Sequence, residues 1–301
     1  MVLLWLRGNC LEEGGGSFIY AGVVQMEFFK KKAPLGLMGL GNLYRKRELL
    51  WQFTIRNVNL RHKGSYLGIF WSVLNPLLML GLYTFIFGVI FGGRFKSVEG
   101  STSYDFALGI FIGLTIFGLI SETLFMAPQS ILGNPNFIKK IVFPLEILPA
   151  ASVLASVYHF FISLLLCLIG VVFWGPGLDW HCLWFPVVIF PIILISLGLS
   201  WMISALGVFF RDLIPLTQFV STVLFYMSGI FFSASMVPEA VWPLLRINPL
   251  IHAIGLGRDV LLWKQTPDFG PLLYIYLAGF TILFLGNRIF TKLKPGFADV
   301  V

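Results

Sequence analysis

Acidic side chains are the first place to look for chemistry, because carboxylates hold metal ions and move protons. The chain has only 14 Asp and Glu residues among 301, and Glu122 is the one acid inside its long apolar runs. Asp179, Asp212 and Asp259 each stand without an adjacent acid. Membrane-bound prenyl and sugar transferases need clustered acids to hold a metal and a diphosphate. We therefore expect no catalytic residues and no metal site.

The stretch GGRFKS at 92–97 resembles a phosphate-binding loop only superficially. The P-loop pattern places a glycine directly before the lysine, and Phe95 stands there instead. We expect no cofactor on this chain, so that any ATP and Mg²⁺ would be bound by a separate ATPase polypeptide. Cys10, Cys167 and Cys182 lie far apart, which favours neither a zinc site nor a disulfide framework.

Glu122 has two interpretations. An acid within a membrane span is costly and often marks a proton or ion path. However, Glu122 lies only about four residues from the expected end of its apolar run, where interfacial water or a neighbouring helix can satisfy it. A proton-coupled carrier is also expected to carry more intramembrane ionisable groups and paired repeats. The structural role is favoured, and the functional one stays open.

The composition places these residues in a membrane. Hydrophobic residues make up 57% of the chain and charged residues 12%, with a mean hydropathy of +0.88, which excludes a water-soluble domain. Runs of about 20 apolar residues suffice to cross a bilayer. The sequence therefore predicts an all-α integral membrane protein with six transmembrane helices near 67–93, 106–126, 147–174, 184–210, 213–233 and 271–288.

The segments outside these spans are predicted to lie at the membrane surface. Residues 1–43 form an extension that we expect to be weakly ordered. Residues 47–63 predict an interfacial helix with two apolar stripes, one containing Phe53 and the other Trp51 and Ile55. Two stripes favour a helix wedged between lipid and protein, although a simple amphipathic anchor remains an alternative. The Pro-rich stretch 234–270 predicts re-entrant half-helices on the outer side.

The distribution of Lys and Arg predicts the orientation. With a cytoplasmic N-terminus, 16 of the 21 basic residues fall inside and five outside, which favours both termini in the cytoplasm. Residues 1–63 carry ten of the 21, as expected for a segment on an anionic leaflet. We expect no nucleic-acid partner.

Four segments in order carry a family resemblance: RELLWQFTIRNVNLRHKGSYLGIFWSVLNPLLMLGLYTFIFGVIFG at 47–92, NPNFIKKIVFPLEILP at 134–149, RDLIPLTQFVSTVLFYMSGIFFS at 211–233 and INPLIHAIGLGRDVLL at 247–262. They resemble the permease subunit of type-2 ABC exporters for cell-surface polysaccharides such as O-antigen, capsule and teichoic acid. The resemblance implies a homodimer in the bacterial inner membrane, seated on two copies of an ABC ATPase subunit. It also implies a gate helix at 44–66, a six-span domain at 67–301, a coupling segment at 133–146 and an outer gate at 234–270.

The expected function is ATP-driven export of a lipid-linked, O-antigen-like polysaccharide. A permease for hydrophobic small molecules is the alternative, and a proton-coupled carrier or channel a more distant one. Aromatic faces mixed with sparse polar groups suit a sliding sugar chain. The candidate residues fall into three sets: a substrate conduit of Trp71, Asn75, Tyr83, Gln218, Thr222, Phe225, Tyr226 and Phe232; cations for the phosphates of the lipid carrier at Arg56, Arg61, Lys63 and Arg258; and an ATPase-coupling set of Asn136, Lys139, Lys140, Phe143 and Glu146.

Overall fold

The computed structural model describes residues 38–62, 66, 68–90, 103–138 and 143–297, and within these ranges every regular element is helical. The elements are α2 (Met38–Arg45), α3 (Arg47–His62), η1 (Gly68–Phe70), α4 (Trp71–Tyr83), η2 (Thr84–Ile90), α5 (Ser103–Met126), α6 (Gln129–Leu132), α7 (Pro135–Ile138), α8 (Ile147–Trp174), η3 (Trp180–Trp184), α9 (Phe185–Phe209), α10 (Leu213–Met227), η4 (Ala234–Met236), α11 (Trp242–Leu245), α12 (Pro249–Leu261), α13 (Phe269–Leu293) and η5 (Lys294–Gly296).

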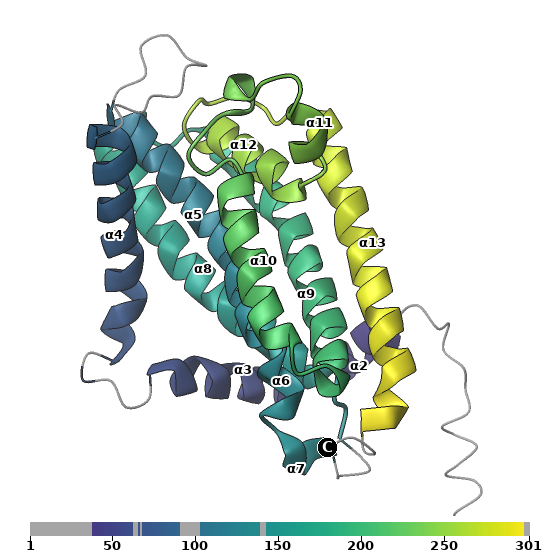
Figure 1. Cartoon of the computed structure of the whole chain (residues 1–301). Coiled ribbons are helices and arrows are strands. Elements are labelled where there is room, and N and C mark those ends of the chain that lie inside the picture. Colours follow the sequence, from purple (N-terminus) through teal and green to yellow (C-terminus); the bar gives the residue numbers. More distant parts are fainter. Residues whose placement is uncertain (1–37, 63–65, 67, 91–102, 139–142, 298–301) are drawn as a thin grey trace, which may run out of the picture.

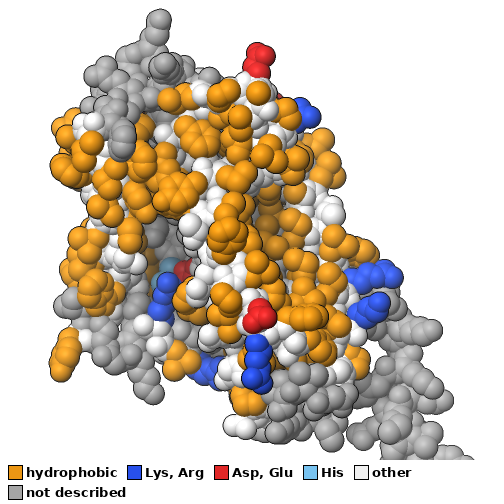
Figure 2. Space-filling model, in the orientation of Figure 1, with side chains coloured by type: hydrophobic (Ala, Val, Ile, Leu, Met, Phe, Trp, Pro, Cys, Tyr) orange, Lys and Arg blue, Asp and Glu red, His pale blue; other side chains and the backbone are white. Residues whose placement is uncertain are grey.

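The long helices form a bundle, and α3 lies across one end of it (Figure 1). Helices α5, α8, α9, α10 and α13 run alongside one another, whereas α4 stands at the edge beside α5 and α8. The short helices α6 and α7 lie at the same end as α3, and α11 and α12 lie at the opposite end. Hydrophobic side chains cover most of the visible face (Figure 2).

Four segments are long and apolar enough to cross a membrane: Tyr104–Met126, Ile147–Trp174, Trp180–Phe209 and Phe269–Gly296. They coincide with four of the six runs expected from the sequence. The other two runs contain shorter apolar helices, Trp71–Phe87 and Leu213–Met227. At 1.5 Å per residue, the 15 residues of α10 reach only about 22 Å, less than the ~30 Å hydrocarbon core.

Helix α10 ends at Met227, earlier than the boundary at 233 expected from hydropathy. Gly229 adopts a positive φ of 71°, a conformation that glycine accepts without a steric penalty and that turns the chain out of the helix. The side chain of Asn248 joins this turn to α12: its Nδ2 donates to the carbonyl of Met227 at 3.2 Å, and its Oδ1 accepts from the Leu250 amide at 3.0 Å. The apolar residues that follow Met227 therefore form a loop, and the loop is buried or half-buried within the protein.

Helices α9 and α13 pack with their backbones in close contact, because glycines face each other at the crossing. A Cβ atom added to Gly286 would lie 2.7 Å from the carbonyl carbon of Gly198. Small residues at a crossing allow such an approach between membrane helices. Near it, Trp201 is fully buried and its indole N–H donates to the Glu146 carbonyl at 3.1 Å. Helices α9 and α13 therefore form a closely packed side of the bundle.

Helix α3 has one side on protein and one exposed, but Leu60, expected on the same stripe as Phe53, is exposed. Phe53 is buried, whereas Trp51 and Ile55 are exposed. The helix packs against α8. Helix α2 begins at Met38, inside the extension that was expected to be weakly ordered, and residues 1–37 lie outside the described residues.

Candidate functional site

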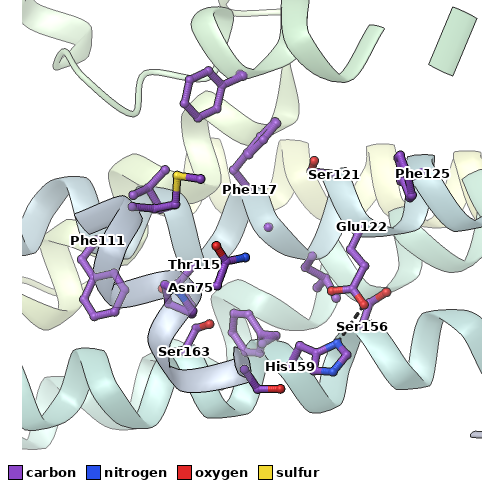
Figure 3. A pocket seen from close by; sticks show the side chains of 18 of the residues that line it. Asn75, Phe111, Thr115, Phe117, Ser121, Glu122, Phe125, Ser156, His159 and Ser163 are labelled. Atoms are coloured by element: carbon purple, nitrogen blue, oxygen red, sulfur yellow. Dashed lines mark hydrogen bonds and ion pairs between the residues drawn. The ribbon is translucent and has the colours of Figure 1, made fainter. Parts of the chain in front are cut away.

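A cavity of about 710 Å³ lies between α4, α5 and α8. The space-filling view shows a hollow on this face, with acidic, basic and histidine side chains together at its lower end (Figure 2). The wall combines aromatic rings with small polar groups that point into the space, as the close view shows (Figure 3). The polar lining residues include Asn75 on α4, Thr115 and Ser121 on α5, and Ser156 and Ser163 on α8.

The predicted conduit residues divide between this cavity and other surfaces. Trp71, Asn75, Tyr83 and Phe225 line the cavity together, although they come from two separate helices. The Tyr83 and Phe225 rings pack with their centroids 5.5 Å apart.

The remaining four conduit candidates lie elsewhere. Gln218, Thr222 and Tyr226 follow one another at four-residue spacing on the exposed side of α10. Phe232 lines a separate pocket of about 230 Å³ near α12.

A second cavity, of about 540 Å³, lies between α3, α5, α6 and α8. Its wall includes Asn57 and Leu60 from α3, Met126 from α5 and Ser152 from α8. The two cavities have three lining residues in common, Arg61, Glu122 and His159. We call these three residues the polar triad.

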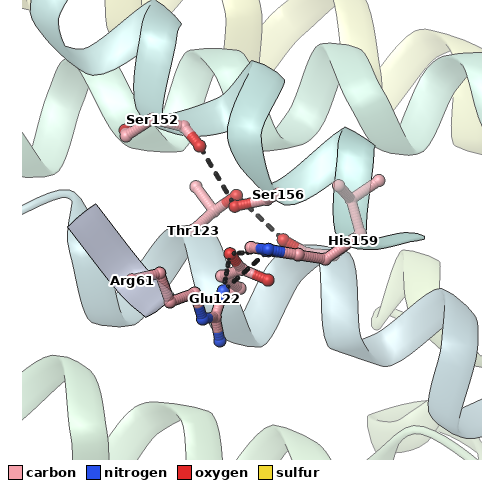
Figure 4. A network of polar contacts seen from close by, with 7 residues as sticks. Arg61, Glu122, Thr123, Ser152, Ser156 and His159 are labelled. Carbon is pink, nitrogen blue, oxygen red and sulfur yellow. Dashed lines mark hydrogen bonds and ion pairs between the residues drawn. The ribbon is translucent and has the colours of Figure 1, made fainter. Parts of the chain in front are cut away.

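The polar triad joins three helices (Figure 4). Arg61 on α3 forms an ion pair with Glu122 on α5 through Nη1 and Oε1. The Nδ1 atom of His159 on α8 lies 2.8 Å from both of these atoms. The imidazole therefore accepts from Arg61 in one tautomer and donates to Glu122 in the other. The side chains of Glu122 and His159 are 13% exposed, and that of Arg61 is 39% exposed. The Glu122 carboxylate is thus mostly buried, and it has two partners.

Sequence reasoning considered Glu122 and Arg61 separately and missed His159. The available signal was a histidine inside the apolar run 147–174, because an ionisable group in a span usually has a partner on another helix. The structural interpretation of Glu122 agrees with this geometry, since the neighbouring helices α3 and α8 satisfy the carboxylate.

Arg56 binds protein in the structure. Its Nη2 donates to Oδ1 of Asn134 at 2.8 Å, and its guanidinium carbon lies 4.5 Å from the centre of the Phe53 ring. The Phe53 ring also packs against Phe137 and Phe143, at centroid distances of 5.3 and 5.5 Å. These contacts attach α3 to the predicted coupling segment 133–146.

The other coupling candidates differ in their surroundings. Asn136 is exposed on α7. Glu146 is buried at the start of α8 and forms an ion pair with Lys294 at 2.8 Å, which connects the coupling segment to the end of α13. Lys63, Lys139 and Lys140 lie outside the described residues.

Arg258 is on α12, which lies at the opposite end of the bundle from α3 (Figure 1), and it is 5% exposed. Its guanidinium donates to the carbonyls of Gly109, Ile230 and Phe232 at 3.0, 2.6 and 3.2 Å. The bonds to Ile230 and Phe232 satisfy irregular backbone after α10, which a nonpolar environment requires, and the bond to Gly109 joins this backbone to α5. Burial raises the pKa of the neighbouring Asp259 to about 6, whereas the Arg258 charge acts to lower it.

The described residues contain no group of three His, Cys, Asp or Glu side chains placed to hold a metal ion.

Comparison with known proteins places this arrangement in a family. The family described as ABC-2 type transporter matches residues 48–262. The O-antigen export system permease protein RfbA of Klebsiella pneumoniae is 28% identical over 265 residues, which cover 87% of this chain and 97% of the relative. The protein of the same name from Myxococcus xanthus is 26% identical over 261 residues, covering 86% and 97%. The polysialic acid transport protein KpsM of Escherichia coli is 23% identical over 239 residues, covering 78% and 90%. Because the match spans well over half of its 301 residues, the chain belongs to the ABC-2 type transporter family.

Proposed function

We propose that this chain is the transmembrane subunit of an ATP-driven exporter that moves a lipid-linked polysaccharide across the bacterial inner membrane. The observation that carries the proposal is the cavity beside α4, lined by aromatic faces and small polar groups, in a chain whose named relatives export O-antigen and polysialic acid. Sugar rings stack on aromatic faces through their apolar sides, and sparse hydroxyl and amide groups meet their edges. The same lining suits a hydrophobic small molecule less well because of its polar groups.

In this proposal the shorter helices α4 and α10 complete a set of six spans. Both termini are cytoplasmic, which the excess of 16 basic residues over five supports. Helix α3 and the C-terminal end of α13 lie at the same end of the bundle (Figure 1). This arrangement also supports placing both termini on one side of the membrane. The region 234–270, including α11 and α12, then lies on the outer side as the gate of the conduit.

The proposed assembly contains two copies of this chain and two copies of a separate ATPase. The proposal places the second copy on the exposed face of α10 that carries Leu216, Phe219, Val220 and Val223. The segment 133–146 is proposed to dock on the ATPase. Its attachment to α3 through Phe53 and Arg56 offers a route by which ATPase movement reaches the cavity.

A genetic experiment tests the function. Deleting the gene in its host should remove the polysaccharide from the cell surface and leave the lipid-linked polymer on the cytoplasmic side of the membrane. Expression of the chain should restore export only when the partner ATPase can hydrolyse ATP. Surface polysaccharide that persists in the deletion strain would contradict the proposal, and export that follows the proton gradient instead of ATP would favour a secondary carrier.

A further inference from the structure

The polar triad has the composition of an anion site that is already occupied by a side chain. Arg61 and the Nδ1 atom of His159 both meet the same oxygen of Glu122. A guanidinium group binds phosphate as well as carboxylate, and it favours groups that offer several oxygens. The Arg61 guanidinium could therefore donate to a phosphate oxygen, but in this structure a carboxylate oxygen of Glu122 accepts from it instead.

The position of the polar triad determines which ligand reaches it. The three residues belong to the walls of both cavities, so that a molecule passing from the cavity beside α3 to the cavity beside α4 meets them. Arg61 is 39% exposed, whereas Glu122 is 13% exposed, and the guanidinium is thus the more accessible partner. An anionic group arriving through the α3 cavity can contact Arg61 without first burying itself.

His159 makes an exchange of partners feasible. A mostly buried carboxylate that loses its only cation is left with a large desolvation cost. Glu122 has a second partner at 2.8 Å, and the tautomer of His159 with a protonated Nδ1 donates to it. The carboxylate therefore keeps a hydrogen bond when Arg61 turns to another anion.

We propose that Glu122 occupies the place on Arg61 that a phosphate group of a lipid-linked substrate takes on arrival, and that His159 then holds the displaced Glu122. The proposal rests on the proposed function for the identity of the ligand. The exchange also breaks the ion pair that attaches α3 to α5. Binding of the headgroup thereby loosens the gate helix at the boundary between the two cavities.

The test is the binding of farnesyl diphosphate to the purified complex of the full chain and its ATPase, measured without nucleotide. Arg61→Gln should weaken binding about tenfold, because the cation is lost. Glu122→Gln should tighten binding about fivefold, because the competing carboxylate is removed. An ion pair with a purely structural role predicts no gain of affinity. Unchanged or weaker binding by a folded Glu122→Gln variant would overturn the proposal.

Matched controls and a second variant keep the result interpretable. Glu48→Gln on the exposed part of α3 and Arg288→Gln on α13 should leave the affinity unchanged, since neither residue lines the two cavities. If Glu122→Gln does not fold, Glu122→Asp serves instead: its shorter side chain should loosen the pair and tighten binding about twofold. No gain with Glu122→Asp would also overturn the proposal.

Related probes separate the possible sources of the phosphate. Inorganic pyrophosphate should bind more weakly than farnesyl diphosphate and show the same dependence on Glu122, while farnesol should not compete. Equal affinity for both phosphates, or competition by farnesol, would overturn the assignment to a lipid-linked phosphate. If substitutions of Glu122 change the phosphate affinity as expected but the complex does not export polysaccharide, the proposed function alone is refuted. If the complex exports polysaccharide but substitutions of Glu122 leave the phosphate affinity unchanged, the exchange alone is refuted.

Discussion

Replacing Gly286 by alanine tests the close crossing of α9 and α13. The new Cβ would lie 2.7 Å from the carbonyl carbon and 2.8 Å from the Cα of Gly198. Ordinary van der Waals contact begins at 3.4 Å, and the carbonyl oxygen of Gly198 would lie nearer still, so that the helices must separate by more than 3.4 minus 2.7, or 0.7 Å. The opposing atoms are backbone, which cannot rotate away as a side chain can.

The expected loss of stability follows from two opposing terms. Overpacking of this kind costs about 3 kcal/mol or more when backbone must move. Alanine in a helix gains about 1 kcal/mol over glycine. We therefore expect the free energy of unfolding to fall by about 2 kcal/mol, as the difference of these terms.

Reversible unfolding in mixed micelles with a denaturing detergent, followed by tryptophan fluorescence, measures this difference. Gly255→Ala on α12 is the matched control, because nothing lies within 4 Å of its added Cβ. The control should be neutral or slightly more stable than the unmodified protein. A Gly286→Ala variant as stable as that control would refute the close crossing of α9 and α13.

Three further predictions concern the function directly. Phe143→Ala removes a ring packed against Phe53, and it should reduce export more than fivefold while ATP hydrolysis and membrane insertion continue, as an uncoupling assay would show. If the exposed side of α10 lines a conduit between the two copies, Thr222→Cys and Tyr226→Cys in a variant without native cysteines should react with a water-soluble thiol reagent during transport, whereas Thr217→Cys, which is buried, should stay protected. Burial raises the pKa of Asp259, so the folded state holds a proton that the unfolded state releases between about pH 4 and 6, and stability falls as pH rises through that window. Asp259→Asn should remove this fall in pH-dependent unfolding measurements, and an unchanged slope would contradict it.

Hydropathy located the long helices because a span is a property of composition, and four of the six expected runs coincide with helices long enough to cross a membrane. It failed at the end of α10, where the residues stay apolar but the backbone turns at Gly229. Apolar loop and apolar helix have the same hydropathy. Their difference depends on the Asn248 and Arg258 side chains, which come from a later segment of the chain.

The candidate site was predictable only in part, for a related reason. Trp71, Asn75 and Tyr83 are spaced four and eight residues apart on one helix and therefore share a face of it. That they line the same cavity could be predicted from this spacing alone. The polar triad requires three helices, and residue spacing along the chain carries no information about their mutual rotation. Arg56 and Arg61 are five residues apart on α3, yet Arg56 binds Asn134 and Arg61 binds Glu122. Which partner each arginine meets depends on the same rotation of the helices.

Transport by the purified chain together with its ATPase is the decisive measurement of the proposed function. The chain and its ATPase would be reconstituted into sealed vesicles that carry a lipid-linked glycan on the ATPase side, and glycan reaching the lumen would be measured with a labelled lectin. We expect translocation that requires ATP, requires both polypeptides and persists when the proton gradient is abolished. Translocation by the chain alone, driven by a proton gradient and indifferent to ATP, would contradict the proposed function.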